Sequence, residues 1–349
     1  MIMSEVKKSM YDISWKVTEP EYRKGNGLSY STIARFHREG FGKLGSLFDR
    51  IDNPSLVFGS MVDTLITGSQ EEFDSTFLVA EFPSVVDSQV NVIKYLFEKY
   101  SDEYQSILDI PDDSIIMAAN ILEFQSRWKS ETRVKAIKEN GIEYYNLLYL
   151  SIGKILVSTQ EYKNAAECVK ILKECSTTDF YFSPVNPFEN NIEKLFQLKF
   201  KGTYEGIELR CMADEVIVNH DTKTVTPIDL KTSFKQEWNF PESFIKWCYW
   251  IQAQLYWYII RQNMDADPLY KDYDLENYKF IVISNGTRIP LIWDYPDTKA
   301  SATCYYGKDN QIECKNWREI VKDLHYYLTI KPNVPKGIKE TNNIIDWIK

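Results

Sequence analysis

Three short apolar or alternating runs, separated by turn residues, constrain the fold of this chain more than any other feature. They cover Lys194–Lys201, Ile207–Val218 and Thr224–Leu230. Gly202, Gly206 and the polar stretch Asn219–Thr222 stand between them. Runs of this length, bounded by glycine and asparagine, are typical of strands joined by tight turns. The sequence therefore predicts a β-meander in the second half of the chain.

The rest of this half predicts a helix, a hairpin and a final helix. These elements are expected at Glu242–Gln262, Tyr278–Ser284, Arg288–Trp293 and Trp317–Leu328. Pro241 precedes the first of them, and proline is well tolerated where a helix begins. Asn285-Gly286 favours a tight turn between the two strands.

The first half of the chain carries helical patterns instead. Residues 1–27 are polar and irregular, Ser29 is expected to cap a helix, and another helix is predicted at Leu56–Thr67. Four more helices are expected at Val86–Tyr100, Ser114–Trp128, Ile142–Val157 and Tyr162–Glu174. Helices followed by strands, a helix and strands predict an α/β fold of the mixed α+β kind.

The charge balance argues against a protein that coats nucleic acid through charge alone. The 349 residues carry a net charge of −9, and the pI is near 5.1. A local basic groove can still lie on an acidic body, so DNA is not excluded as a partner. Aromatic residues reach 14%, which suits a base-stacking surface as well as an aromatic core.

Cysteines and hydropathy narrow the setting. The six cysteines form no C-x-x-C pair, which argues against a zinc ribbon or an iron–sulfur cluster. The N-terminus lacks the apolar segment of a signal peptide, and no run of about 18 apolar residues occurs. We therefore expect a cytoplasmic protein with free thiols and no membrane partner.

One acid-x-lysine triplet, Asp229-Leu230-Lys231, differs from the others by its context. At least five other such triplets occur, so the pattern alone carries little information. This one ends the apolar run that begins at Thr224. Because residues two apart share one face of a strand, the side chains of Asp229 and Lys231 should point the same way.

A second acid, Asp214, lies upstream in the apolar run Met212–Val218, across the turn at Asn219–Thr222. Pairing of the two strands would bring two carboxylates and a lysine together. Buried like charges are costly unless a cation neutralises them. The sequence therefore predicts an oxygen-rich site that suits Mg²⁺ or Mn²⁺.

These residues resemble a known catalytic signature. Ala213-Asp214, followed by Ile228-Asp229-Leu230-Lys231-Thr232, is similar to the signature of the PD-(D/E)XK nucleases. More narrowly, it resembles the phage-type exonuclease branch. That branch includes exodeoxyribonuclease VIII, the lambda exonuclease and the RecB-type nuclease domain of recombination helicases.

Two further segments support the narrower resemblance. Gln252-Ala253-Gln254-Leu255-Tyr256 is similar to the family's Q-x-x-x-Y element on the helix after the lysine. Gln254 and Tyr258 have the same spacing, so a second register stays open, although Gln252 is the favoured match. Gly59-Ser60-Met61-Val62-Asp63 is similar to the family's Gly-Ser-x-x-His element, with Asp63 at the histidine position. Glu193 is a candidate for an upstream family glutamate.

The resemblance implies a restriction-endonuclease-like core, in which helices flank a central mixed sheet. Residues 186–331 would form this core. Residues 1–185 would form a large, mainly helical region that contributes one helix, at about 56–67, to the active site, and residues 332–349 a polar tail.

The implied activity is metal-dependent exonuclease digestion of linear, double-stranded DNA in phage-type recombination, repair or replication. Catalysis is expected from Asp214, Asp229, Lys231 and Gln252, and binding of Mg²⁺ or Mn²⁺ from Asp63, Asp214, Asp229 and the Leu230 carbonyl. Ser60, Thr232, Gln252 and Tyr256 would contact DNA. The resemblance also implies a single-strand-annealing or recombination partner, a homo-oligomer, and the host cytoplasm if the protein is phage-encoded.

Two other functions stay open. The first is an endonuclease on the same fold, which would need an element that recognises DNA sequence. The second is a DNA-binding accessory protein that retains the nuclease fold without activity. The intact set of two acids and a lysine favours an enzyme, because a structural role would not require it.

Overall fold

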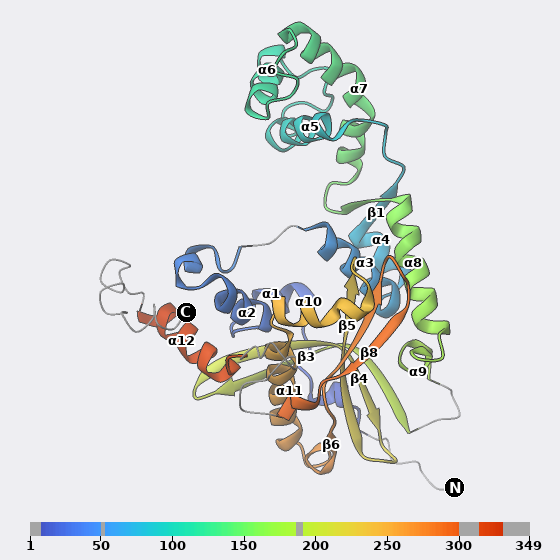
Figure 1. Ribbon diagram of the computed structural model, residues 1–349, viewed down its shortest axis with the longest axis vertical. Coiled ribbons are helices and arrows are strands. Elements are labelled where there is room, and N and C mark those ends of the chain that lie inside the picture. The colour runs from blue at the N-terminus through green and yellow to red at the C-terminus, as the bar shows by residue number, and fades with distance from the viewer. Residues whose placement is uncertain (1–7, 50–52, 186–190, 300–313, 331–349) are drawn as a thin grey trace. The chain divides into compact units, whose positions relative to one another are not determined.

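A computed structural model describes residues 8–49, 53–185, 191–299 and 314–330 (Figure 1). The chain divides into two compact units. The first, here called the core unit, comprises residues 1–59 and 168–349, and the second, the helical unit, comprises residues 60–167. These limits differ from the predicted boundary at residue 185, and the predicted polar tail, 332–349, lies outside the described residues.

Among the described residues, the core unit contains one six-stranded sheet of order β3-β4-β5-β7-β8, with β6 paired to β5. The strands are β3 (Ile192–Tyr204), β4 (Ile207–Asn219), β5 (Thr224–Ser233), β6 (Asp274–Leu275), β7 (Lys279–Ser284) and β8 (Pro290–Asp294). The pairs β3–β4, β4–β5 and β7–β8 are antiparallel, whereas β5 runs parallel to β6 and β7. The meander and the later hairpin are both confirmed, and the sheet is mixed as predicted.

Helices of the core unit pack against this sheet and against one another. They are η1 (Met10–Ile13), α1 (Glu19–Lys24), α2 (Tyr30–Glu39), η2 (Phe41–Ser46), α9 (Asp179–Phe182), η3 (Glu237–Asn239), α10 (Phe240–Lys246), α11 (Tyr249–Asp265), η4 (Tyr270–Asp272), η5 (Pro296–Lys299) and α12 (Trp317–Ile330). The central helix, α11, contacts β3, β4, α2 and α12. Its buried face joins a core that includes Ile33, Phe200, Phe280 and Trp317.

The prediction of a single helix at Glu242–Gln262 is wrong, because the helix is interrupted between α10 and α11. Cys248 adopts a left-handed conformation there, with φ 60° and ψ 42°. The carbonyl of Trp247 accepts hydrogen bonds from Tyr30 Oη at 2.6 Å and from Arg38 at 3.4 Å. Side chains of α2 therefore satisfy a carbonyl that a continuous helix would have bonded internally.

Of two expectations for the N-terminal region, one is wrong and the other is confirmed in position. Residues 1–27 are not wholly irregular, since Thr18 and Glu21 form a capping box that begins α1. Ser29 does occupy the N-cap of α2, but its hydroxyl makes no capping bond and instead meets the hydroxyls of Ser31 and Thr32.

The helical unit has its own apolar core and a short two-stranded sheet. Its elements are α4 (Gln70–Thr76), β1 (Phe77–Ala80), α5 (Asp87–Tyr100), α6 (Asp112–Ile121), α7 (Ser130–Leu150) and β2 (Ile155–Ser158). Helices α3 (Pro54–Thr67) and α8 (Thr159–Glu174) each cross from one unit into the other. Helices α5, α6 and α7 pack around a core that includes Val92, Leu96, Ile137 and Tyr145.

Two of the predicted helices in this unit were misplaced. The segment Ile142–Val157 is not one helix, because α7 ends at Leu150 and residues 155–158 pair in parallel with β1. The helix predicted to end at Trp128 ends at Ile121, and Glu123 and Gln125 follow with positive φ. In the described part of the chain, every helix is too short or too polar to cross a bilayer.

Candidate functional site

Strands β4 and β5 part at the two acids that the sequence singles out. Their ladder extends from Asn219↔Thr224 to Glu215↔Ile228 and goes no further. Beyond it, the backbone N–H of Leu230 donates to Asp214 Oδ2 at 2.9 Å. A side-chain carboxylate thus replaces the next rung of the sheet, and this bond places Asp214 beside the Asp229–Lys231 triplet.

Asp229 is the most enclosed of these groups, at 1% exposure. Lys231 Nζ lies 2.5 Å from Asp229 Oδ2, and Gln252 Nε2 donates to Asp229 Oδ1. The predicted common orientation of Asp229 and Lys231 is therefore what the strand provides. One carboxylate oxygen faces a cation and the other faces an amide, which offsets part of the cost of burying the charge.

The surroundings of Lys231 keep it charged. Burial lowers the pKa of Lys231, but Asp229, Tyr249 and Asp214 raise it by more, so the pKa lies above its ordinary value. Its Nζ also lies 4.8 Å from the centre of the Tyr249 ring, an arrangement that favours a cation.

Sequence reasoning missed Tyr249. It begins α11, three residues before Gln252, so the two side chains lie on neighbouring positions of one helix face. This spacing was a usable signal, but the expected uninterrupted helix placed Tyr249 in mid-helix among several other aromatic residues. Because the helix is interrupted at Cys248, Tyr249 is the first residue of α11.

The positions of Gln252 and Gln254 on α11 distinguish the two possible matches to the Q-x-x-x-Y element. Gln252 donates a hydrogen bond to Asp229. Gln254 is equally buried, but it lies two residues further along the helix and therefore on a different face. Tyr256 is 7% exposed, and its ring packs against Tyr30 and Tyr278. That packing favours a core role for Tyr256 over the predicted contact with DNA.

Gly59 explains how close α3 comes to the end of β5. A Cβ added at Gly59 would lie 3.0 Å from Thr232 Oγ1. The glycine therefore permits a close approach. Ser60 and Asp63 follow on the same helix but belong to the helical unit, so their predicted roles in DNA and metal binding stay predictions.

The donors in the core unit have the chemistry of a hard-cation site. Within the described residues, no three His, Cys, Asp or Glu side chains gather into a metal-binding group. Asp214 and Asp229 supply two carboxylates, with the Leu230 backbone between them. Gln252 Oε1 is buried and lacks a hydrogen-bond partner in the part of the chain that the structure describes. An oxygen-only set with a spare acceptor fits Mg²⁺ and its water ligands.

Glu193 has a different setting. It pairs with Val218 in the β3–β4 ladder, and its carboxylate contacts His220 Nε2 at 2.9 Å and accepts from Ser9 Oγ at 2.8 Å. His220 Nδ1 in turn meets Tyr273 Oη at 2.9 Å. This network ties the N-terminal segment to the turn after β4, which favours a structural role for Glu193.

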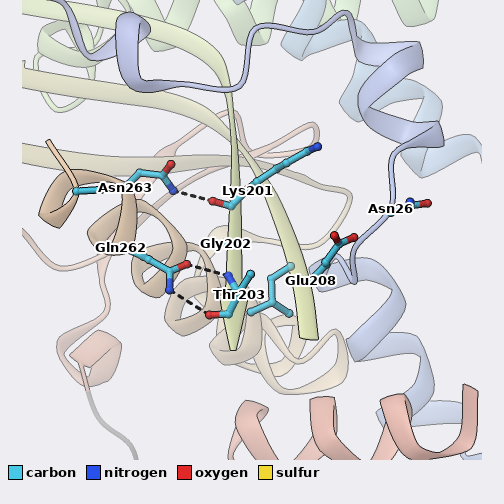
Figure 2. A pocket seen from close by; sticks show the side chains of 9 residues that line it. Asn26, Lys201, Gly202, Thr203, Glu208, Gln262 and Asn263 are labelled. Carbon is cyan, nitrogen blue, oxygen red and sulfur yellow. Dashed lines mark hydrogen bonds between the residues drawn. The ribbon is translucent and has the colours of Figure 1, made fainter. Parts of the chain in front are cut away.

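A pocket of about 320 Å³ lies elsewhere in the core unit (Figure 2). Gln262 donates to and accepts from the backbone of Thr203, and Asn263 donates to the carbonyl of Lys201. These amides satisfy the outer edge of β3, where a neighbouring strand would otherwise bond. None of the predicted site residues lines this pocket.

Comparisons with known proteins add little. No protein family matches the chain, and no curated protein matches it. Among solved structures, a "putative exonuclease" from Eubacterium rectale is similar at 13% identity and a TM-score of 0.38, over 94% of this chain and 88% of that one. The protein SSO0001 is similar at 10% identity and a TM-score of 0.24, over 80% and 86%. Likeness this weak carries no argument about function, so the proposal below depends on the site.

Proposed function

We propose that the protein is a Mg²⁺-dependent deoxyribonuclease that hydrolyses phosphodiester bonds of linear DNA, most simply from its ends. The observation that carries this proposal is the grouping of Asp214, Asp229, Lys231 and Gln252 where β4 and β5 part. Packing of the sheet alone does not require two acids, a cation and an amide at the point where two strands separate. The resemblance to the PD-(D/E)XK signature supports the same reading.

Each residue has a distinct chemical task in this proposal. Asp214 and Asp229, with the Leu230 carbonyl, would hold the metal. When bound, Mg²⁺ supplies a Lewis acid for the phosphate and lowers the pKa of a water ligand. Lys231 places a positive charge where negative charge develops on the phosphate. Gln252 holds the Asp229 carboxylate in place, and its Oε1 can accept a hydrogen bond from a water.

The test compares linear DNA with covalently closed circular DNA of the same sequence, in Mg²⁺, in Mn²⁺ and in excess EDTA. We expect loss of linear DNA alone, and only with metal. Nicking of the circles would indicate an endonuclease on this fold. Activity that is equal in EDTA, or no loss of either substrate, would refute the proposal.

A further inference from the structure

The segment between β5 and α11 is fixed at several points but leaves large aromatic rings in solvent. It starts at Phe234, directly after the last residue of β5, and continues through η3 and α10. The carbonyl of Ser233 accepts from Asn285 N at 2.8 Å, and buried Glu237 accepts from Thr287 Oγ1 at 2.5 Å. Phe240 packs against Tyr249, the residue whose ring lies beside Lys231.

Three rings on this segment are exposed to solvent, and the two nearest β5 are the most exposed. Phe234 is 58% exposed and Trp238 is 59% exposed. The ring of Phe234 also contacts the buried ring of Phe58, with ring centres 5.5 Å apart. Single exposed apolar side chains are common and need no explanation. Two on one short, anchored segment beside the candidate site are a less ordinary arrangement.

Cations alternate with these rings. Lys235 stands between Phe234 and Trp238 in sequence, and its side chain is half exposed. At the far end of α10, Lys246 and Arg38 both lie over the exposed Trp247 ring, at 4.9 Å and 5.2 Å. The chain as a whole has a net charge of −9, so these positive groups are a local feature. Glu242, which pairs with Lys235, is the one acid exposed along this stretch of described residues.

We propose that Phe234, Trp238 and Trp247, with Lys235, Lys246 and Arg38, bind a single strand of DNA next to the candidate catalytic site. The inference rests on the proposed nuclease function and names the form of DNA that this side of the site takes. Aromatic rings stack on bases whose faces are open, as they are in a single strand and not in a duplex. Cations on the same segment as the rings can pair with phosphates, which favours nucleic acid over an apolar protein partner.

The decisive measurement is the affinity for a fluorescein-labelled oligo(dT), followed by fluorescence anisotropy in EDTA so that no cleavage occurs. Stacking on one base contributes about 1–3 kcal/mol, so Trp238→Ala should weaken binding by roughly 5- to 150-fold. Trp238→Phe should keep most of the affinity, whereas Trp238→Leu should behave like the alanine variant, because leucine is apolar but cannot stack. Lys246→Ala should weaken binding and make it less dependent on salt.

Trp128→Ala is the matched control, because Trp128 is 45% exposed but lies in the helical unit. It should leave oligo(dT) affinity unchanged. Wild-type affinity in Trp238→Ala and Phe234→Ala, an equal loss in Trp128→Ala, or no binding of oligo(dT) by the wild type would each overturn the assignment.

The two proposals fail separately. If the wild type digests linear DNA with Mg²⁺ but Trp238→Ala binds oligo(dT) normally, the single-strand surface is wrong and the nuclease stands. If no digestion occurs but binding is lost in Trp238→Ala, the surface stands and the nuclease proposal is wrong.

Discussion

Asp214 and Glu215 are neighbours on β4, but they lie on opposite faces of the sheet and differ in the partners of their carboxylates. Glu215 pairs with Ile228, so it lies on the face opposite Asp229. It is 1% exposed, and neither carboxylate oxygen has a hydrogen-bond partner in the described part of the chain. Asp214, on the other face, accepts the Leu230 N–H and lies near Lys231.

The difference shows two ways of burying an acid. On the Asp229 face, a lysine and hydrogen-bond donors contact the two carboxylates. On the Glu215 face, burial raises the pKa of Glu215 to about 8, and nearby Lys194 offsets only part of that shift. Glu215 is therefore protonated at neutral pH, which is the cheaper state when partners are few. A face that surrounds its acids with a lysine and N–H donors is suited to a cation, and a face that protonates its acid is not.

The largest expected effect separates the two faces by catalysis. Asp229→Asn and Lys231→Ala should each lower DNA cleavage by about 10³-fold or more, because each removes a charge that the proposed reaction needs. Glu215→Gln should retain most of the activity. Initial rates on linear DNA, with melting temperatures in metal-free buffer, provide the measurement.

Matched controls come from other acid-x-lysine triplets. Asp221→Asn and Lys163→Ala alter the same pattern at exposed positions and should leave the rate unchanged. A Glu215→Gln variant as inactive as Asp229→Asn, with an intact fold, would remove the contrast between the faces.

The next effect concerns stability and pH. The folded-state pKa of Glu215, about 8, exceeds the ordinary value of 4.5, so the folded state binds the proton more tightly. The resulting stabilisation is fully present below pH 4.5 and is lost as the pH rises towards 8. Relative to wild type, Glu215→Gln should therefore gain up to about 5 kcal/mol of unfolding free energy across this interval.

Denaturant unfolding of both proteins in EDTA, at several pH values from about 4.5 to about 9, measures this difference. Asp74→Asn, an exposed acid in the helical unit, serves as the control. Parallel pH profiles for wild type and Glu215→Gln would mean that Glu215 is charged and has a partner in solution.

A smaller effect tests how Asp229 is held on its face of the sheet, which is called the charged face below. Gln252→Ala should lower the cleavage rate by about 10- to 100-fold, because Asp229 loses the amide that orients it. Gln254→Ala should have the smaller effect on rate, although both glutamines are buried. Single-turnover rates, corrected for any loss of folded protein, distinguish them, and the reverse order would favour the Gln254 register.

Sequence patterns predicted the sheet and its acids because both depend on local rules. Alternation and turn residues predict strands β3, β4 and β5, and side-chain direction along a strand predicts that Asp229 and Lys231 share a face. The predictions that were wrong failed because those structures depend on contacts between residues far apart in the sequence. The helix break at Cys248 depends on Tyr30 and Arg38, which bond the Trp247 carbonyl from more than 200 positions away. Strand β2 depends on its pairing with β1, and Ile155–Ser158 alone is too short to be told from the end of a helix.

The smallest expected effect asks whether a third acid joins the charged face. Asp63 lies on α3 in the helical unit, at the histidine position of the family's Gly-Ser-x-x-His element. We predict that Asp63 contributes to metal binding in the place of the family histidine. Asp63→Ala should then raise the Mg²⁺ concentration for half-maximal cleavage by roughly 10-fold, the lower range for groups that support a metal site.

Asp63→His separates a ligand from a surface acid. Imidazole is a softer ligand than carboxylate, so this variant should keep activity but shift its preference from Mg²⁺ towards Mn²⁺. Asp74→His, on α4 of the same unit, should shift nothing. If Asp63→Ala matches wild type at limiting metal, the charged face holds its cation with Asp214 and Asp229 alone. In that case the departure from the family's histidine would mark a site with fewer side-chain ligands, and Gly59 would serve only the packing of α3 on β5.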